Sequence, residues 1–246
     1  MVHRFSSCFS YSSSSVLQQG AINLKGNKED IKHLEDALRG HGKLSSFVMS
    51  NFTVDQDNVS LDELVKALGT ISTLKKVVLE SHKEAESNFT GEALSALCAD
   101  NQFQELRIAS FRLAPQHYDL ISAAVAKTTT LEILRLNRVG MAQPCAVKLS
   151  TGLASNTTLK MVDLSSNDIE DVGATALAES LKNHATIEHL RLWDNKSIGD
   201  AGFNALADML EANNHILKLD TPNTADHPGA ARIKKILVDK RSALIE

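Results

Sequence analysis

One 28-residue unit recurs along this chain and limits what the chain can fold into. Its clearest copy is LKMVDLSSNDIEDVGATALAESLKNHAT, residues 159–186. The apolar residues Leu159, Val162 and Leu164 have the spacing L-x-x-L-x-L of a short strand, and helical periodicity runs from about Asp171 to Asn183. One strand and one amphipathic helix cannot bury their apolar sides alone. The unit therefore requires neighbouring copies of itself.

Copies of the unit extend over most of the chain. Aligned on the first apolar position of each strand, they are separated by 25 to 30 residues, and most steps are 28 or 29. This period leaves room for a full α-helix in every repeat. The sequence predicts an α/β solenoid, a horseshoe of about eight repeats, with parallel strands on the concave face and helices on the convex face. The predicted copies begin at Gln19, Leu44, Leu74, Phe103, Leu131, Leu159, Ile187 and Ile216.

The two ends of the chain differ from the central repeats. Residues 1–18 contain seven serines, one arginine and no acidic residue, a composition typical of a flexible tail and also of a targeting peptide. We interpret this segment as a Ser-rich flexible tail, followed by one repeat domain over residues 19–246. Its last part, residues 216–246, contains a basic helix. Because a terminal repeat has no neighbour on one side, we expect this part to be a C-terminal cap with a polar outer face.

The composition argues against several classes of partner and location. Hydrophobic residues make up 43% of the chain, charged residues 23%, and the net charge is -4, so nucleic acid is not an expected partner. No apolar run approaches the roughly 18 residues that span a bilayer, so we expect no membrane association. Cys8, Cys98 and Cys145 are odd in number and lack C-x-x-C spacing. This usage favours buried thiols in a reducing compartment, and we expect a cytoplasmic protein.

The residues between the strand leucines form the surface on which we expect a partner protein to bind. Side chains of a strand alternate between its two faces, so these residues point to the concave side. In each repeat, one such residue belongs to a first column and the residue two positions later to a second. The first column is Asn23, Val48, Val78, Arg107, Arg135, Asp163, Arg191 and Asp220. The second column is Lys25, Ser50, Glu80, Ala109, Asn137, Ser165, Trp193 and Pro222.

The C-terminal half of these columns is charged and aromatic. Trp193 is the only tryptophan of the chain, and the repeat register places it outside the core. Tryptophan and arginine are enriched at interface hot spots. A structural interpretation stays open, in which Trp193 covers Arg191 or the end of the solenoid and the charges form a solvated ladder. The residues predicted to contact the partner are Arg107, Arg135, Asn137, Arg138, Asp163, Arg191, Trp193, Asp194 and Asp220.

The sequence lacks the common motifs of catalysis, metal binding and cofactor binding. It contains no phosphate-binding glycine loop, no H-E-x-x-H and no G-x-S-x-G. The acidic turn Asp168, Glu170 and Asp171 lacks the ligand number and glycine spacing of a calcium loop. We interpret these acids as interacting with the dipole of a helix N-terminus. We expect neither an enzyme nor a bound cofactor or metal.

The repeat pattern resembles the ribonuclease-inhibitor-like leucine-rich repeat family. The resemblance rests on LKMVDLSSNDIEDVGATALAESL and IEHLRLWDNKSIGDAGFNALADML, with weaker copies over the rest of residues 19–246. The family includes the ribonuclease inhibitor, the GTPase-activating protein of Ran, the repeat regions of NOD-like receptors and the capping domains of tropomodulin-like proteins. Almost all of them act by binding another protein. The resemblance therefore implies a non-enzymatic protein-protein interaction module, which we expect to be a monomer.

Two other functions found in this family stay open. A GTPase-activating regulator resembling the Ran activator would act through loops at the strand ends. That group carries an acidic C-terminal tail, whereas this chain ends in a basic helix. A tropomodulin-like actin-capping domain is the second option, because the segment DHPGAARIKKILVDKR looks like the basic closing helix of such domains.

The family places an asparagine after each strand, and its side chain bonds the backbone of successive turns. This chain has the asparagine at Asn27, Asn167 and Asn195 only. We expect the ladder to be interrupted in the middle repeats, with irregular turns there. The equivalent residues in those repeats are Phe52, His82, Phe111 and Val139.

Overall fold

The computed structural model describes residues 25–26, 28–38, 44–54, 60–86, 90–99, 103–222 and 227–243. Residues 1–24 lie outside the described residues, and with them the predicted Ser-rich tail, Cys8 and the start of the first predicted repeat. Strands and helices alternate along the chain. The strands are β1 (Lys25–Gly26), β2 (Ser46–Val54), β3 (Lys76–Glu86), β4 (Glu105–Arg112), β5 (Ile133–Asn137), β6 (Met161–Asp163), β7 (His189–Arg191) and β8 (Lys218–Asp220). The helices are α1 (Lys28–Leu38), α2 (Asp62–Gly69), α3 (Gly91–Ala99), α4 (Pro115–Lys127), α5 (Gln143–Ser155), α6 (Asp171–Leu181), α7 (Asp200–Ala212) and α8 (Pro228–Ala243).

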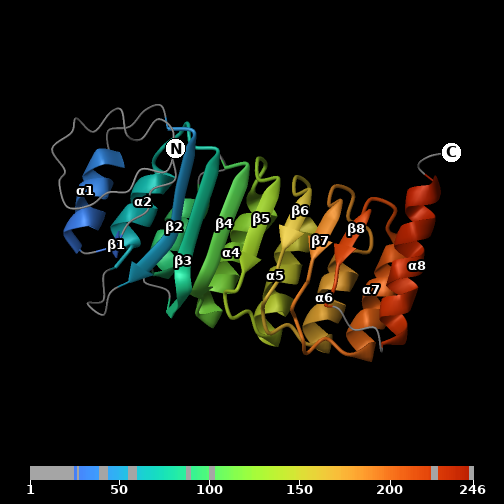
Figure 1. Cartoon of the computed structure of the whole chain (residues 1–246). Helices are drawn as coiled ribbons and strands as arrows, with labels where there is room; N and C mark the ends of the chain where they lie inside the picture. The colour runs from blue at the N-terminus through green and yellow to red at the C-terminus, as the bar shows by residue number, and fades with distance from the viewer. Residues whose placement is uncertain are drawn as a thin grey trace.

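The described strands form one parallel sheet in chain order, from β1 to β8. The helices lie side by side along one face of this sheet (Figure 1). Neighbouring strands stack about 4.8 Å apart, whereas packed helices need about 8–10 Å. The face of the sheet turned away from the helices is therefore the inner, concave face. The α/β leucine-rich repeat solenoid predicted from the period of the sequence is confirmed.

A continuous apolar core fills the space between the sheet and the helices. Every second strand residue points into it. In β5, Leu134 and Leu136 are fully buried, and the alternating Ile133, Arg135 and Asn137 are partly exposed. Leu177 of α6 and Leu206 of α7 are fully buried on the helix side. Burying one leucine contributes roughly 1.5–3 kcal/mol, and each leucine is covered partly by the next repeat, so the repeats stabilise one another.

Asn167 organises the turn after β6. Its Nδ2 donates to the carbonyl oxygens of Leu136 and Leu164 at 2.8 and 2.9 Å. Its Oδ1 accepts the amide hydrogens of Val139 and Met141, both at 3.0 Å. The asparagine of the next repeat makes equivalent bonds to carbonyl oxygens and to an amide. One buried side chain thus joins two successive turns.

The strands are longer where this asparagine is missing. β2 and β3 have nine and eleven residues and run through Phe52 and His82, whereas β6 has three. Phe111 and Val139 occupy the asparagine position in the next two repeats and are fully buried apolar side chains. The expected interruption of the asparagine ladder is therefore confirmed.

The expectation of irregular turns is wrong for the repeats of Phe111 and Val139. The residue before each of them has the same left-handed backbone as the residue before the two turn asparagines, with φ between 56° and 61°. A hydrogen bond from the neighbouring helix α4 holds one of these turns, because the Tyr118 hydroxyl donates to the Val139 carbonyl oxygen at 3.3 Å. The four left-handed residues, at intervals of 28, are Ser110, Arg138, Ser166 and Asp194.

The first repeat departs from the predicted register. The alignment of the repeats places Lys25 beside Ser50, but in the sheet Lys25 pairs with Thr53 and Gly26 pairs with Val54. The reason is the length of β2. This strand continues past the expected turn, and β1 pairs with its last residues. The predicted second column is therefore wrong at its N-terminal end.

A second ladder holds the opposite edge of the solenoid, where helices end and strands begin. Asn156 Oδ1 accepts the amide hydrogens of Thr158 and Leu159 at 2.9 and 2.7 Å. One repeat later, Nδ1 of His184 accepts the equivalent amide hydrogens at 3.4 and 3.2 Å. Asn213 takes this position in the following repeat. Burial lowers the pKa of His184, which favours the neutral ring that this bonding requires.

Helix α8 packs against α7 at the C-terminal end of the described solenoid. Arg232 of α8 forms ion pairs with Asp208 and Glu211 of α7 at 2.6 and 2.5 Å. Lys240 Nζ donates to the Asn213 carbonyl oxygen, next to the end of α7. These polar contacts attach a helix that has only one apolar side to bury.

The described helices carry two cysteines. Cys145 in α5 is a free thiol and 4% exposed, as expected for a buried cysteine. Cys98 lies in α3, and its side chain is outside the described residues. Across the described ranges, no helix combines the length and the apolar character needed to cross a membrane.

Candidate functional site

The first predicted column exists in the structure from β4 to β8. The Cα register of the sheet places one residue of each strand directly beside its counterpart in the next strand. Two hydrophobic residues continue the column into β2 and β3. Strand alternation turns these side chains to the concave face. The column in β4–β8 is Arg107, Arg135, Asp163, Arg191 and Asp220.

The C-terminal part of the column is a closed polar network. Arg191 lies between two carboxylates: its Nη1 donates to Asp163 Oδ2 at 3.2 Å and its Nε to Asp220 Oδ2 at 3.0 Å. The other oxygen of Asp163 accepts the Ser165 amide hydrogen at 3.0 Å. Asp163 is only 5% exposed, so its charge depends on these partners. Both carboxylates are occupied from within the chain.

His189 is a member of this network that the two predicted columns omit. Its Nε2 lies 2.9 Å from Asp220 Oδ2. Burial lowers the pKa of His189, and the hydrogen bond to Asp220 opposes this only in part. Burial would raise the pKa of Asp220, but the hydrogen bonds from His189 and Arg191 and the charge of Lys218 hold that pKa below its ordinary value. Near neutral pH, a neutral His189 thus donates Nε2–H to an ionised Asp220.

The position of His189 on the concave face could have been predicted from the sequence. It lies two residues before Arg191, on the same side of the strand, at a position where each repeat has another outward side chain. In the sheet, His189 pairs with Lys218 of the next strand and with Met161 of the preceding strand. Strand alternation alone predicts this third column.

The middle part of the column is paired less completely. Arg107 Nη2 donates to Glu80 Oε1 at 3.0 Å. Glu105 accepts an ion pair from Lys76 at 2.8 Å and lies 3.8 Å from Arg135 Nε, which is too far for a hydrogen bond. In the described part of the chain, the buried Nε atoms of Arg107 and Arg135 have no hydrogen-bond partner. Two guanidinium donors therefore remain unused on neighbouring strands.

Three further predicted residues lie just beyond the ends of the strands. Trp193, two residues after β7, is 54% exposed, as the repeat register predicts. Arg138 is exposed and directly follows β5. Asp194 has a left-handed backbone and forms an ion pair with Lys196 at 3.4 Å. These residues lie along the edge of the concave face at which the strands end.

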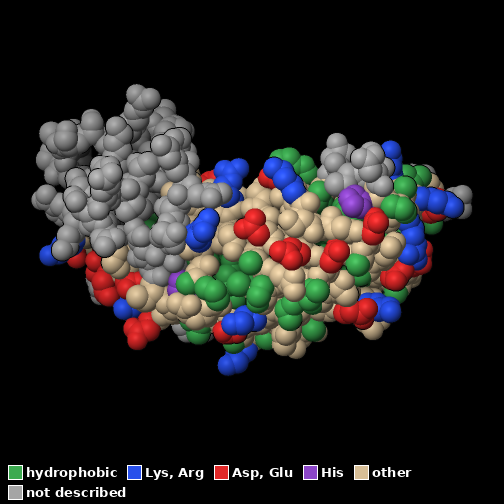
Figure 2. Space-filling view, turned by 90° about the horizontal axis from the view of Figure 1, so that it is seen from below, with side chains coloured by type: hydrophobic (Ala, Val, Ile, Leu, Met, Phe, Trp, Pro, Cys, Tyr) green, Lys and Arg blue, Asp and Glu red, His purple; other side chains and the backbone are tan. Residues whose placement is uncertain are grey.

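Acidic side chains line the middle of the edge where strands end and helices begin, which Figure 2 shows from below. Asp168 and Glu170 are exposed in this part of the chain. Asp171 has a structural role, because its Oδ1 accepts the amide hydrogens of Gly199 and Gly202 at 2.6 and 2.9 Å. It therefore caps α7, the helix of the next repeat, which refines its predicted interaction with a helix N-terminus.

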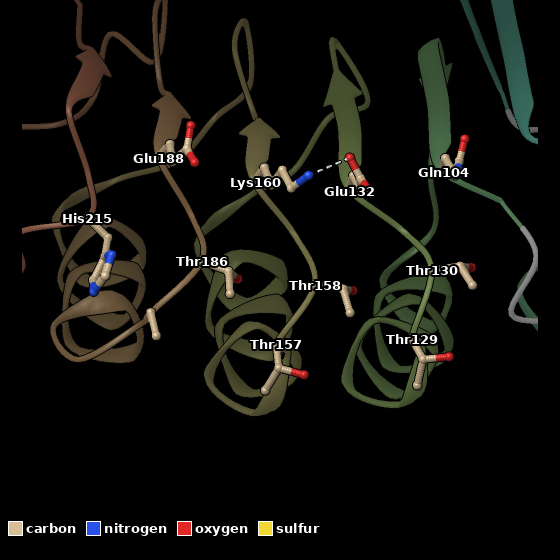
Figure 3. A pocket seen from close by; sticks show the side chains of 11 residues that line it. Gln104, Thr129, Thr130, Glu132, Thr157, Thr158, Lys160, Thr186, Glu188 and His215 are labelled. Atoms are coloured by element: carbon tan, nitrogen blue, oxygen red, sulfur yellow. Dashed lines mark hydrogen bonds and ion pairs between the residues drawn. The ribbon is translucent and has the colours of Figure 1, made fainter.

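The opposite edge contains an open groove of about 540 Å³ beneath β4–β8 (Figure 3). Its threonine hydroxyls serve the fold, since those of Thr158 and Thr186 donate at 2.8 Å to carbonyl oxygens of the preceding repeat. Lys160 reaches toward Glu132 and pairs with it at 2.9 Å. Thr158, Thr186 and the Lys160–Glu132 pair are therefore already engaged within the chain.

The concave face presents charged and aromatic side chains and has no cluster suited to a metal. Among the described residues, no group of three or more His, Cys, Asp or Glu side chains could hold a metal ion. The arginine side chains are fixed on a rigid sheet at the strand spacing of about 4.8 Å. Such an array can bind acidic and aromatic groups of another macromolecule by hydrogen bonding and stacking.

Sequence comparison relates most of this surface to one family. The family model of the TMOD/LMOD leucine-rich domain matches residues 100–238. Leucine-rich repeat-containing protein 45 of Gallus gallus is 33% identical over 104 residues, which are 42% of this chain and 16% of that protein. Capping protein, Arp2/3 and myosin-I linker protein 3 of Rattus norvegicus is 27% identical over 194 residues, 77% of this chain and 12% of that protein. The chain thus spans less than a fifth of the length of these relatives.

Two solved structures have a similar fold. One is leiomodin-1 actin-binding site 2, with a TM-score of 0.53 and 18% identity over 63% of this chain and 88% of that chain. The other is the tropomodulin C-terminal domain of Caenorhabditis elegans, with a TM-score of 0.53 and 14% identity over 63% of this chain and 95% of that chain. At these identities the likeness shows the fold alone.

Proposed function

This chain belongs to the TMOD/LMOD leucine-rich domain family, and from that premise we propose that it is a non-enzymatic interaction domain that binds actin through its concave face. The family match covers residues 100–238, which contain the whole charged column of β4–β8. One solved relative in fold carries actin binding in its name. The proposal also includes a cytoplasmic location, where actin would be accessible.

The observation that carries the proposal is the exposure of Trp193 beside this column. A tryptophan that is 54% exposed leaves a large apolar surface in water. Tryptophan is among the residues that dominate binding energy in interfaces. We therefore assign Trp193 as the anchor of the proposed contact, with the arginines of β5 and β4 two and three strands away on the same face.

The proposal assigns different roles to the predicted contact residues. Asp163 is nearly buried and bonded at both oxygens, so it belongs to the fold of the C-terminal repeats. Arg191 holds Asp163 and Asp220 in place, which makes it a supporting residue. We assign the direct contacts to residues with unused groups or with side chains that are at least partly exposed. These are Arg107, Arg135, Asn137, Arg138, Trp193 and Asp194.

Actin binding by a Trp193→Ala variant tests the proposal. Val172→Ala is a matched control, because Val172 is 55% exposed and lies in the helix layer. Fluorescently labelled actin, as monomers and as filaments, is titrated with the wild-type chain and both variants. We expect a loss of at least about tenfold in affinity for Trp193→Ala and no change for Val172→Ala.

The thermal unfolding of the three proteins is measured in parallel, so that a loss of affinity is not a loss of fold. Absence of actin binding by the wild-type chain would overturn actin as the partner. Equal binding by the wild type and Trp193→Ala would overturn the concave face as the contact surface.

A further inference from the structure

Unused hydrogen-bonding atoms cluster at the centre of the concave face. Five buried side-chain polar atoms in the described residues have no hydrogen-bond partner, and four of them belong to three neighbouring repeats. The exception is Nε2 of His184, at the edge of the solenoid. The four clustered atoms are Arg107 Nε, Arg135 Nε, Asn137 Oδ1 and Ser165 Oγ.

These atoms lie on adjacent strands. Arg107 of β4 pairs in register with Arg135 of β5. Asn137 is two residues after Arg135 on the same strand and on the same face. Ser165, two residues after β6, is 8% exposed. The cluster therefore combines two N–H donors with an amide oxygen and a hydroxyl, on a surface no larger than three strands.

The cluster has a cost that a bound group would remove. A buried donor or acceptor without a partner destabilises a protein by about 1–3 kcal/mol, and native proteins retain few of them. In the neighbouring network around Arg191, every carboxylate oxygen named above has a donor. The unused atoms are thus concentrated in one part of the face, which points to a ligand from outside the chain.

The charge of the cluster indicates the kind of ligand. We count the described residues of the first column on β3–β5 and the residues two positions before and after them on the same strands. Three of these side chains are basic and two are acidic. Glu105 lies 2.8 Å from Lys76 and 3.8 Å from Arg135, so Arg135 has the least neutralised charge of the set. A guanidinium presents its N–H donors in a fork that matches a carboxylate. The residues are Lys76, Glu80, Glu105, Arg107 and Arg135.

The geometry points to a receptor for a carboxylate side chain, formed by Arg107, Arg135 and Asn137, which binds an acidic segment of the partner protein. Because these atoms are buried, the two arginine side chains, each 28% exposed, turn when the segment binds. Arg135 Nε–H then donates to the carboxylate, Arg107 Nε–H supports it from the next strand, and Asn137 Oδ1 accepts an amide hydrogen of the bound segment. This inference rests on the proposed function only in that a protein occupies the concave face. It adds the chemistry and the place of the contact.

Arginine Nε–Hε resonances in NMR spectra test the receptor directly. The probe is an octapeptide of glutamate, with an octapeptide of lysine as the opposite-charge control. Arg191 and Arg232 serve as internal references, because their Nε atoms already donate to carboxylates. We expect the glutamate peptide to shift the Hε signals of Arg107 and Arg135 downfield and to leave those of the two references in place. Equal shifts at all four arginines, or none at Arg135, would overturn the inference.

Charge removal with a matched control provides the second readout. Arg135→Gln is compared with Lys127→Gln, which removes one positive charge from an exposed position at the end of α4. We expect about a tenfold loss of affinity for the glutamate peptide and for actin in Arg135→Gln, and no change in Lys127→Gln. If actin does not bind but the peptide contacts Arg135, the proposed partner is wrong and the receptor stands. If actin binds and neither readout involves Arg135, the receptor is wrong and the proposed function stands.

Discussion

Strands β6, β7 and β8 have three residues each, whereas β2 and β3 have nine and eleven. Both sets belong to the same repeating unit and the same sheet. After β6 and β7, a buried asparagine follows the strand and bonds the turn of the preceding repeat. In the middle repeats, apolar residues such as Phe111 and Val139 fill that position. One fold is therefore held by hydrogen bonds at one end and by additional strand pairing and apolar packing in the middle.

The same division appears on the concave face. Around Arg191, the carboxylates of Asp163 and Asp220 are bonded from within the chain. Around Arg135, guanidinium donors are unused. We infer that the charged column of the C-terminal part contributes mainly to stability, whereas the arginines of the middle part and the exposed Trp193 after β7 are available for recognition. The following changes test this division, from the largest expected effect to the smallest.

Asn167→Leu should cause the largest loss of stability. Leucine keeps the branched shape of the side chain, with somewhat larger end groups, but leaves the buried amides of Val139 and Met141 without an acceptor. Each buried unpaired group costs about 1–3 kcal/mol, so we expect a loss of about 4 kcal/mol in the free energy of unfolding. Urea denaturation followed by circular dichroism measures it. Asn204→Leu, at an exposed position of α7, is the control and should change stability by less than about 0.5 kcal/mol. Similar losses in both variants would contradict the role of the ladder.

Arg191→Gln and Arg135→Gln compare the two parts of the concave column. Removing Arg191 leaves the 5% exposed carboxylate of Asp163 with one donor fewer. Because the Arg191 side chain is itself 37% exposed, solvent screening limits the expected loss to about 1–2 kcal/mol. Arg135→Gln should change the free energy of unfolding by less than about 0.5 kcal/mol. Chemical denaturation of both variants measures the difference. Equal losses in the free energy of unfolding would contradict the proposed difference between the two parts of the column.

Tyr118→Phe tests how much a hydrogen bond contributes to a middle turn that lacks the asparagine. The change removes only the hydroxyl that donates to the Val139 carbonyl oxygen at 3.3 Å, and Tyr118 is otherwise fully buried. We expect a loss of about 1 kcal/mol, the usual contribution of one hydrogen bond. Thermal and urea unfolding provide the measurement. A loss as large as that of Asn167→Leu would mean that the middle turns depend on hydrogen bonds as strongly as the C-terminal ones.

His184→Asn should have little effect at pH 7.5 and a protective effect under mild acid. Asparagine already serves the same position at Asn156 and Asn213. Burial lowers the pKa of His184 in the folded state, so the unfolded chain binds more protons and the wild type loses stability as the pH falls from about 6.5 through the folded pKa. This loss, on the order of 1 kcal/mol or less, should be smaller in the variant. Melting temperatures of both proteins between pH 7.5 and pH 5 test it, and parallel pH curves would exclude a contribution of His184.

The repeat architecture can be predicted from the sequence because packing requires a fixed period. The charged column then follows from the stacking of the repeats. Leu134 and Leu136 recur at a fixed period since every repeat must cover its neighbour. In-phase stacking then places Arg135 beside Arg107 without further information. The missing asparagine in the middle repeats misled the prediction of the turns. The turn before Val139 keeps its left-handed backbone without an asparagine, because the stacked neighbour also determines its path.

The pairing details required coordinates. The position of Lys25 depends on how far β2 extends, and repeat spacing does not encode that length. The contact of His189 with Asp220 follows from a third outward column that strand alternation implies and that the two-column prediction omitted. Whether the N–H donors of a given arginine have hydrogen-bond acceptors depends on small differences in distance. Arg191 Nε lies 3.0 Å from Asp220 Oδ2, whereas Arg135 Nε lies 3.8 Å from Glu105 Oε1. Register alone does not supply these distances.

The most direct test of the division is the affinity of Arg191→Gln and Arg135→Gln for actin, measured side by side at a temperature where both are fully folded. The account predicts that Arg135→Gln loses about tenfold in affinity while Arg191→Gln, although less stable, binds within about twofold of the wild type. The reverse order, with affinity lost at Arg191 and retained at Arg135, would contradict the assignment of recognition to the middle of the concave face.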